Sequence, residues 1–579
     1  MSLVAERTGI TGRRRPGARL LRRLLAAIAV GAAAVALFGC YLRLSATFAT
    51  GSDGASNALE AWDLLHGNWL LRGWTLTDVS FYTTELPEYA LVELARGLRP
   101  AVVHIAAAIT YTLLVATAAA LARGRARGRE GWARALIAAG IMLAPQLGNG
   151  VQVLLEQPDH VGTQVLLLGI FLLVDRAPRR WHTVAALWAL LTAAVVADKI
   201  AIVDAAIPLA FAGGLHAIWA CAAGRPARVG RLTRVGFAVG ALRRQWFELG
   251  LAVAACAAVG AAQLVTAGIS RLGGFALLPV ETGMVTPGRV PGHLSMTLQD
   301  TLNLFGADVG VAPSGPQAVF AWLHAPGIAL AAAAFGLAVW RVPCREDLVA
   351  DLLAVGLVVN LAGFVASVIP ASPYDARELA AALPYGAVLA GRAFGPWLTG
   401  ARPASRPRFR LGPGVAAIRP GVAALVLAGG CQLAALGYEA TRPPAVGSEQ
   451  ALAGWLAAHQ LTTGLGTYNE DNVITVDSGG AVRMLTVSWR PRPAGGTVAR
   501  LYQSSAAWYD PRTADANFVV TGPADGTADL IPQAEILALA GPPARSYQFE
   551  SFTIMVWDEN LLALLASPPS RTPGDIGHL

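Results

Sequence analysis

The chain has 579 residues, of which 54% are hydrophobic and only 14% are charged, and its mean hydropathy is +0.49. A soluble globular protein carries about 25% charged residues, so this composition indicates a chain embedded in a lipid bilayer. The formal net charge of +8 does not indicate nucleic-acid binding, because the arginines lie in short segments between apolar runs. The five cysteines do not have metal-ligand spacing, and no disulfide framework can be read from them.

The N-terminal segment predicts a signal anchor. Arginines in RRRPGARLLRR precede the apolar run LLAAIAVGAAAVALFGCYLRL, which is too long for a signal peptide. Further apolar runs follow, so we predict an α-helical polytopic membrane protein with about 11 transmembrane helices. The predicted spans are 24–47, 101–122, 133–152, 161–176, 183–199, 202–222, 247–269, 318–340, 348–370, 377–398 and 415–437.

Arginines between these runs predict the orientation. If residues 1–23 are cytoplasmic, so are the arginine-rich segments RGRARGREGWAR, DRAPRRW, GRPARVGRLTRVGFAVGALRRQW, RVPCRED and GARPASRPRFRLGPG. The connections on the opposite side hold few basic residues for their length, so the positive-inside rule is met throughout. We therefore expect a multi-pass protein of the cell (plasma) membrane with a cytoplasmic N-terminus and an extracytoplasmic C-terminal region.

The first outer loop, residues 48–100, is predicted to contain two short helices. Asn57 and Glu60 have the spacing of a capping box, so one helix is expected from Ala58 to His66. A second is expected from Pro87 to Leu98, with acids at its start and arginines at its end, as suits the helix dipole.

Residues 441–579 are more polar than the predicted transmembrane domain, 24–440. The stretches NVITVDS, VRMLTVSW, ANFVVTG and YQFESFTIMVWD are predicted to be strands. SEQALAGWLAAHQL and IPQAEILALAG are predicted to be helices, the second ending at Gly541. We therefore expect a small C-terminal α/β extracytoplasmic domain.

Several stretches resemble the GT-C superfamily of membrane glycosyltransferases, in particular its actinobacterial cell-envelope members. They are GSDGASNALEAWDLLHGNWLLRGW in the first outer loop, LNLFGADVG in a later outer loop and YDARELAAALPYGAVLAGR at the tenth apolar run, together with AAWYDP, FVVTG and FTIMVWDENL near the C-terminus. The resemblance implies a GT-C fold over nearly the whole chain. It also implies an enzyme that transfers a sugar from a polyprenyl-phosphate donor to a glycan or lipid-linked acceptor of the cell envelope.

Members of this superfamily use an acid of the first outer loop as catalytic base, and Asp53 matches that acid by position. Many members have two adjacent acids there, whereas Gly54 follows Asp53 in this chain. A carboxylate suits the role because a sugar hydroxyl is a poor nucleophile until its proton is being removed. The alternative is that Asp53 simply caps the helix that follows it.

The departing lipid phosphate needs a cation opposite it, and basic residues are few in the predicted outer loops. Arg377 is the first candidate and Lys199 the second. Arg377 could instead pair with Asp375 or Glu378 in sequence, and Lys199 could pair with Asp198.

Asp159, His160 and Glu85 are candidate ligands of a divalent cation, Mg or Mn, because carboxylates with an imidazole suit several metals. The alternatives are a solvated turn for Asp159 and His160, and a dipole partner of its own helix for Glu85.

Two other functions remain open from the sequence. One is a transporter or flippase, and the other is a non-catalytic membrane scaffold whose outer domain binds glycan. The chain has no Walker A loop, no HExxH motif and no GxSxG motif in a strand–helix context. An ATPase, a zinc protease and a serine hydrolase are therefore not expected.

Overall fold

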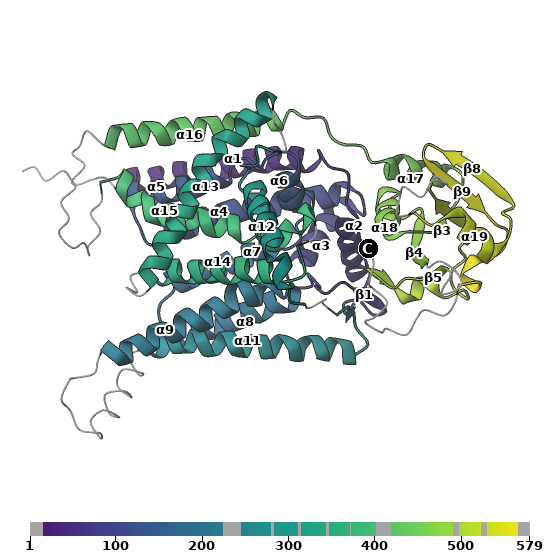
Figure 1. Ribbon diagram of the computed structural model, residues 1–579, viewed down its shortest axis with the longest axis horizontal. Helices are drawn as coiled ribbons and strands as arrows, with labels where there is room; N and C mark the ends of the chain where they lie inside the picture. The colour runs from purple at the N-terminus through teal and green to yellow at the C-terminus, as the bar shows by residue number, and fades with distance from the viewer. Residues whose placement is uncertain are drawn as a thin grey trace, which may run out of the picture.

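The structure, a computed structural model, describes residues 16–223, 245–279, 283–310, 314–342, 347–370, 372–400, 418–489, 497–522 and 530–565. An elongated body of helices carries a smaller domain with a β-sheet at one end (Figure 1). In this view α16 runs along one side of the body, and α8, α9 and α11 form the opposite side. The short helix α2 lies where the body meets the C-terminal domain.

The body is built from the following helices and helical turns. They are α1 (Pro16–Ser45), α2 (Ser52–Leu65), α3 (Glu85–Arg96), α4 (Ala101–Arg123), α5 (Gly128–Met142), α6 (Asn149–Val151), the π-turn η1 (Gln152–Glu156), α7 (Val161–Arg176), α8 (Trp181–Ala197), the π-turn η2 (Ile202–Ala206), α9 (Ile207–Ala223), α11 (Trp246–Arg271), the 3₁₀ turn η3 (Pro287–Arg289), α12 (Val290–Leu304), α13 (Gly315–Arg341), α14 (Leu348–Ala366), the 3₁₀ turn η5 (Pro373–Leu379), α15 (Ala382–Leu398) and α16 (Ile418–Glu439).

Six helices in the described part of the chain are long and apolar enough to cross a membrane. They are Leu24–Ser45, Ala101–Arg123, Ile202–Trp219, Trp246–Arg271, Gly315–Arg341 and Leu348–Ala366. The number rises to seven if Asn149–Glu156 and Val161–Arg176, which meet at a bend of 71°, form one broken span. These helices support a multi-pass membrane protein.

The predicted number of about 11 transmembrane helices is not confirmed, although every predicted run overlaps a helix. The helices α5 and α8 contain 15 and 17 residues, which is short of the roughly 20 that a straight span needs. The orientation of the termini stays a prediction.

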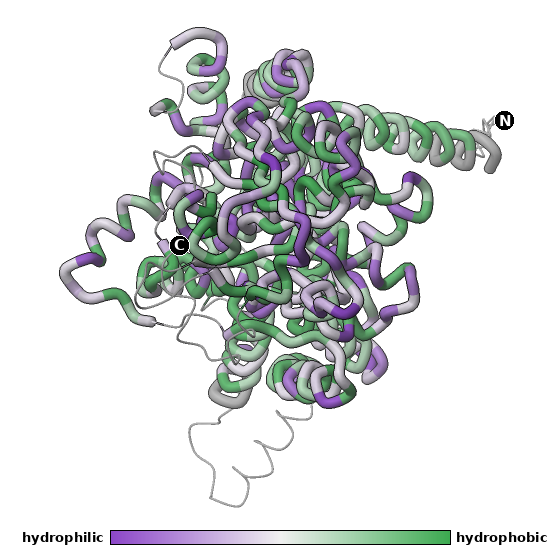
Figure 2. Tube along the Cα trace, turned by 90° about the vertical axis from the view of Figure 1, so that its right-hand side faces the viewer, coloured by the Kyte–Doolittle hydropathy of each residue, from purple (hydrophilic) through white to green (hydrophobic). Residues whose placement is uncertain are grey.

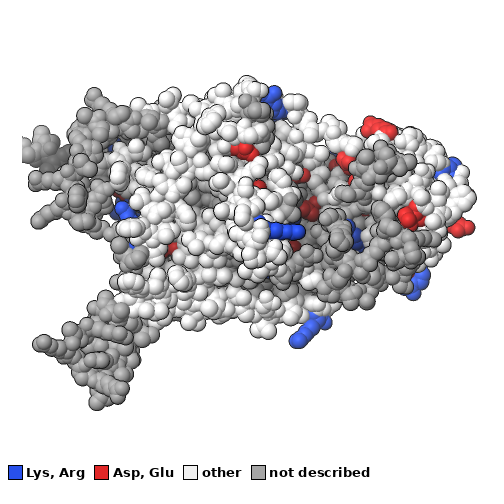
Figure 3. Space-filling view, viewed as in Figure 1, with Lys and Arg blue, Asp and Glu red and all other residues white. Residues whose placement is uncertain are grey.

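The surface of the helical body is apolar. Helix α1 projects from the body with a hydrophobic surface (Figure 2). Only 6% of the apolar segment within Leu24–Ser45 is buried inside the protein. On the face shown in Figure 3, charged side chains are sparse over the described part of the body and more frequent toward the C-terminal domain. Both features suit contact with lipid along the body.

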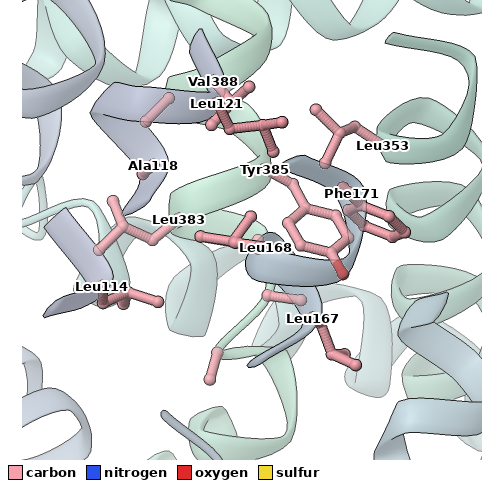
Figure 4. Packing of buried hydrophobic residues seen from close by; sticks show 14 of the residues in the cluster. Leu114, Ala118, Leu121, Leu167, Leu168, Phe171, Leu353, Leu383, Tyr385 and Val388 are labelled. Atoms are coloured by element: carbon pink, nitrogen blue, oxygen red, sulfur yellow. The ribbon is translucent and has the colours of Figure 1, made fainter. Parts of the chain in front are cut away.

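The core of the body lies between α4, α7, α14 and α15. Leu167, Leu168 and Phe171 of α7 pack around the buried Tyr385 of α15 (Figure 4). The rings of Phe171 and Tyr385 are 5.8 Å apart, and the Tyr385 hydroxyl donates a hydrogen bond to the carbonyl oxygen of Asp204 at 3.0 Å. Close packing of this kind stabilises helix association in lipid, where hydrophobic transfer contributes little.

The C-terminal domain contains a six-stranded mixed sheet with strand order β5-β4-β3-β7-β9-β8. Strand β3 is parallel to β4 and β7, and the other pairs are antiparallel. The bounds are β3 (Thr463–Gly466), β4 (Arg483–Trp489), β5 (Thr497–Ala499), β7 (Phe518–Thr521), β8 (Arg545–Phe549) and β9 (Phe552–Val556), with helices α17 (Ser448–Ala458), α18 (Tyr468–Asp477) and α19 (Gln533–Ala540) and the 3₁₀ turns η7 (Ala506–Tyr509) and η8 (Leu561–Ala563). Three of the four predicted strand stretches and both predicted helices are confirmed.

The remaining strand prediction, NVITVDS, is wrong because this stretch lies in α18 and its C-terminal cap. The alternation arises because both faces of α18 are buried. Val473 and Val476 pack against loop 48–100, whereas Ile474 packs against the sheet. Apolar residues on opposite sides of a helix produce the same short pattern as a strand.

A second, three-stranded sheet of order β2-β1-β6 joins three distant segments. They are β1 (Trp74–Leu76) of loop 48–100, β2 (Ala276–Leu277), and β6 (Ser504–Ser505) of the C-terminal domain. Trp74 is opposite Ser505 in the antiparallel pair of β1 and β6. This sheet ties the C-terminal domain to the helical body.

The helix predicted from Ala58 to His66 begins earlier, since α2 runs from Ser52 to Leu65. The capping-box prediction is wrong, because Asn57 lies inside α2 and its side-chain amide donates to Asp159 instead. The early start places Asp53 in the first turn of α2. The second predicted helix of the loop is confirmed as α3.

Candidate active site

Asp53 and Arg377 form an ion pair although 324 positions separate them. Asp53 is in the first turn of α2, and Arg377 is in η5, directly before α15. The Arg377 Nη1 donates to Asp53 Oδ2 at 2.9 Å, with the two side chains 29% and 18% exposed. The structure therefore brings together the candidate base and the first candidate for phosphate binding. The N-cap of α2 is Gly51, and no side chain forms a capping hydrogen bond there.

The C-terminal domain also reaches this ion pair. The Tyr468 hydroxyl, at the start of α18, donates to Asp53 Oδ1 and also contacts Gln503 Oε1. The ring of Tyr502 lies against that of Tyr468, with centroids 4.6 Å apart. Sequence reasoning missed both Tyr468 and Gln503. Neither the strand before Tyr468 nor the helix that begins at Tyr468 was predicted, so the sequence contained no signal for either residue.

Asp159 lies at the break between η1 and α7 and is only 5% exposed. It accepts hydrogen bonds from Asn57 Nδ2 at 2.8 Å and from Gln157 Nε2 at 3.0 Å. Gln157 Oε1 accepts a further hydrogen bond from the backbone N–H of Gly54 at 2.7 Å. These contacts hold the break against the turn of α2 that carries Asp53.

His160 is equally buried and joins two other elements. Its Nδ1 lies 2.8 Å from Asp198 Oδ2 at the end of α8, and its Nε2 lies 3.5 Å from Glu378 Oε1 in η5. The φ of His160 is 57°, a left-handed conformation that is costly for a residue other than glycine. His160 therefore fixes the position of Glu378, the neighbour of Arg377. Asp159 and His160 do not form a solvated turn.

The three predicted metal ligands do not form a donor set in this structure. Glu85 is fully buried, and its Oε1 accepts from the backbone N–H of Thr163 at 2.9 Å. Asp159 and His160 are committed to the protein partners above. Among the described residues, no group of three or more His, Cys, Asp or Glu side chains is arranged to hold a metal ion. Cation binding therefore stays a prediction, and we assign no chemical step to a metal.

Lys199 is half-buried, directly after Asp198 at the end of α8. The Asp198 carboxylate accepts from the backbone N–H of Ile200 at 2.9 Å and faces His160. Within the described residues, Lys199 has no side-chain hydrogen bond or ion pair. Its role in phosphate binding stays a prediction.

Burial disfavours the charged form of two acids near Asp53. Burial raises the pKa of Glu60 well above its usual value, and the neighbouring Asp159 and Asp53 raise it further. Burial also raises the pKa of Glu378, which the nearby His160 partly opposes. The raised pKa of Glu60 favours its neutral form, which reduces like-charge repulsion beside the Asp53–Arg377 pair.

Comparison with known proteins supports the fold. No model of a known protein family matches the chain, and no curated protein matches it in sequence. ArnT from Cupriavidus metallidurans in the apo state is similar in structure, with a TM-score of 0.51, 13% identity, and coverage of 94% of this chain and 100% of that chain. The undecaprenyl phosphate-bound form of that ArnT has a TM-score of 0.49 and 15% identity, over 93% of this chain and 99% of that chain.

The Archaeoglobus fulgidus oligosaccharyltransferase, in complex with Zn and sulfate, has a TM-score of 0.46 and 11% identity, over 84% of this chain and 67% of that chain. At these identities the likeness concerns the fold alone. The comparison with the apo form of ArnT, at a TM-score of 0.51, supports the shared fold. The described helices and the C-terminal sheet domain agree with it. The chain thus shares its fold with ArnT.

Proposed function

We propose that this protein is an inverting membrane glycosyltransferase. It would move a sugar from a polyprenyl-phosphate donor to a glycan or lipid-linked acceptor of the cell envelope, on the outer face of the cell membrane. The observation that supports this most strongly is the Asp53–Arg377 pair. The pair joins the first turn of α2 to η5, and α2 lies where the helical body meets the C-terminal domain (Figure 1).

In this reaction Asp53 accepts the proton of the acceptor hydroxyl. The hydroxyl oxygen forms a bond to the anomeric carbon while the bond from that carbon to the phosphate oxygen breaks. The electron pair of the broken bond leaves on the lipid phosphate. One base and one in-line displacement invert the anomeric centre, and general base catalysis of this kind typically contributes 10²–10⁴-fold.

Arg377 supplies positive charge opposite the departing phosphate. A guanidinium can bind a phosphate through two parallel hydrogen bonds, so Arg377 suits this role. Its Nη1 is paired with Asp53, which keeps both charges compensated. A polyprenyl-phosphate donor is also consistent with ArnT, which shares the fold and binds undecaprenyl phosphate.

A transporter is the alternative that one observation favours. Asp204 is fully buried within the candidate span Ile202–Trp219, and buried carboxylates at such positions often serve transport. However, its two oxygens accept hydrogen bonds from Gln164 Nε2 at 2.7 Å and from Asn360 Nδ2 at 2.9 Å. This arrangement suits a structural link between α7 and α14.

Reconstitution in liposomes separates these functions. The purified protein receives polyprenyl-phosphate hexose or pentose with candidate envelope glycans, and released polyprenyl phosphate and glycosylated product are measured together. A glycosyltransferase yields both in equal amounts. Movement of the sugar lipid across the bilayer without product would indicate a flippase, and binding of glycan without either would indicate a scaffold.

A further inference from the structure

The C-terminal domain is docked onto the part of loop 48–100 that carries Asp53. Asn472 Nδ2 of α18 donates to Ser56 Oγ of α2 at 2.7 Å and to the backbone oxygen of Gln503 at 3.1 Å. The ring of Trp74 in β1 meets that of Trp508, with centroids 5.0 Å apart. Together with the pairing of β1 and β6, these contacts fix the position of α18 against α2.

Two side chains of the C-terminal domain are thereby placed at the Asp53 carboxylate. Tyr468 and Gln503 are 8% and 3% exposed, so water contributes little to their hydrogen bonding. Gln503 has a φ of 43°, a left-handed backbone that is rare outside glycine and that places it directly before β6. Strain of this kind is retained where the surrounding structure enforces it, often at functional sites.

The Tyr468 hydroxyl has one proton and two acceptors, Asp53 Oδ1 and Gln503 Oε1. It can therefore satisfy only one of them fully at a time. Burial, with Asp53 nearby, raises the pKa of Tyr468 well above its usual value, so the phenol keeps its proton over the working pH range.

We propose that Tyr468 is a positioning residue for the catalytic base and that Gln503 is its alternative acceptor. In the structure the phenol donates to Oδ1 while Arg377 donates to Oδ2, so the carboxylate is held at both oxygens. When the acceptor hydroxyl approaches Oδ1, the phenol turns to Gln503, and no buried polar group loses its partner. This proposal rests on the function proposed above, and it assigns the C-terminal domain a part in the active site.

The charged and titratable groups that face Asp53 come from several elements. They are Glu60 of α2, Glu156 of η1, Asp159 at the break, Arg377 of η5, and Tyr468 and Tyr502 of the C-terminal domain. Replacing Tyr468 by phenylalanine changes one of them and leaves the other charges in place. A shift in the pH profile of the Tyr468→Phe variant therefore reports on the lost phenol.

The kinetic test compares the wild type with Tyr468→Phe and Gln503→Leu. Tyr468→Phe should lower kcat/KM for the acceptor about 10-fold and move the acid limb of the kcat/KM profile to higher pH, because the phenol donates to the charged base before the acceptor binds. Gln503→Leu should mainly raise the KM for the acceptor, since the phenol can no longer leave Oδ1 without losing its partner. Tyr547→Phe, whose ring packs on Trp455 at 5.4 Å, is the matched control and should leave the profile unchanged.

A second measurement needs no activity. Hydrogen exchange at the first amides of α18 is compared in Tyr468→Phe, Asp53→Ala and the double variant. If the side chains are coupled, each single change speeds exchange and the double variant exchanges no faster than the faster single variant. Additive effects, or a Tyr468→Phe enzyme whose kcat/KM and its acid limb are unchanged, would overturn the proposal. If the exchange experiment shows coupling but the wild-type protein has no transferase activity, the proposed function is overturned, and with it the kinetic role of Tyr468.

Discussion

Replacing Arg377 by glutamine should separate catalysis from stability. The pair that it forms with Asp53 is partly solvated, since the two side chains are 29% and 18% exposed. Solvent screening limits the contribution of such a pair to the free energy of unfolding to about 1 kcal/mol. In the proposed reaction the same guanidinium faces the charge that develops on the leaving phosphate. Removing one stabilising group at such a position typically costs about 10²–10³-fold in kcat, or about 2.7–4 kcal/mol.

The assay measures polyprenyl phosphate released per enzyme under saturating donor and acceptor, beside the thermal unfolding midpoint of the same preparation. We expect kcat to fall about 10²–10³-fold in Arg377→Gln, while the midpoint moves by only about 2 °C. Arg512→Gln is the matched control, because Arg512 forms an exposed pair with Asp510 at 2.8 Å and should not affect turnover. A turnover that is unchanged in Arg377→Gln, or lost only in proportion to unfolded protein, would refute the assignment.

Two further predictions concern stability. Glu93 on α3 is 2% exposed, and burial raises its pKa from 4.5 to about 9. Neither of its carboxyl oxygens has a hydrogen-bond partner among the residues that the structure describes. The folded state therefore binds the proton more tightly than the unfolded state, and the stability present below pH 4.5 is lost as pH rises through about 9. The thermal unfolding midpoint of the wild type in detergent should decrease as the pH is raised from about 6 to about 10. It should decrease much less in Glu93→Gln. Equal changes of the midpoint with pH in the two proteins would contradict this prediction. Arg392 is 9% exposed and binds both oxygens of Asp347 at 2.8 Å, with Asp175 Oδ1 at 3.3 Å. Arg392→Met removes the cation from these carboxylates, although Asp347 Oδ1 keeps the backbone N–H groups of Val349 and Ala350, and it should cost about 1.5–3 kcal/mol. Substituting Asp347→Asn as well should restore part of the loss. A midpoint within 1 °C of the wild type, measured by calorimetry, would show that the cluster is dispensable.

Hydropathy along the chain was sufficient to predict the helical body. A spanning helix needs a long apolar run, and such a run is visible in a single sequence. The number of crossings could not be predicted in the same way. The run around 149–176 is divided by a bend of 71°, and this depends on the buried contacts of Asp159 and His160 with other elements.

The candidate site was predicted only in part. Asp53 and Arg377 could be singled out because each follows or precedes an apolar run and carries a charge. Tyr468 could not, because its contact with Asp53 joins positions 415 residues apart. That contact depends on how α18 packs on α2, and the residues of α18 alternate as a strand would. Their helical state is a consequence of burial between two apolar layers.

The central claim is that the Asp53 carboxylate removes the proton of the acceptor hydroxyl. Single-turnover release of polyprenyl phosphate by the wild type and by Asp53→Asn, with folding checked by the unfolding midpoint, tests it most directly. Asparagine keeps the size of the side chain but cannot accept the proton, so we predict a rate at least about 10²-fold lower in the variant. Equal single-turnover rates in two equally folded proteins would contradict the claim.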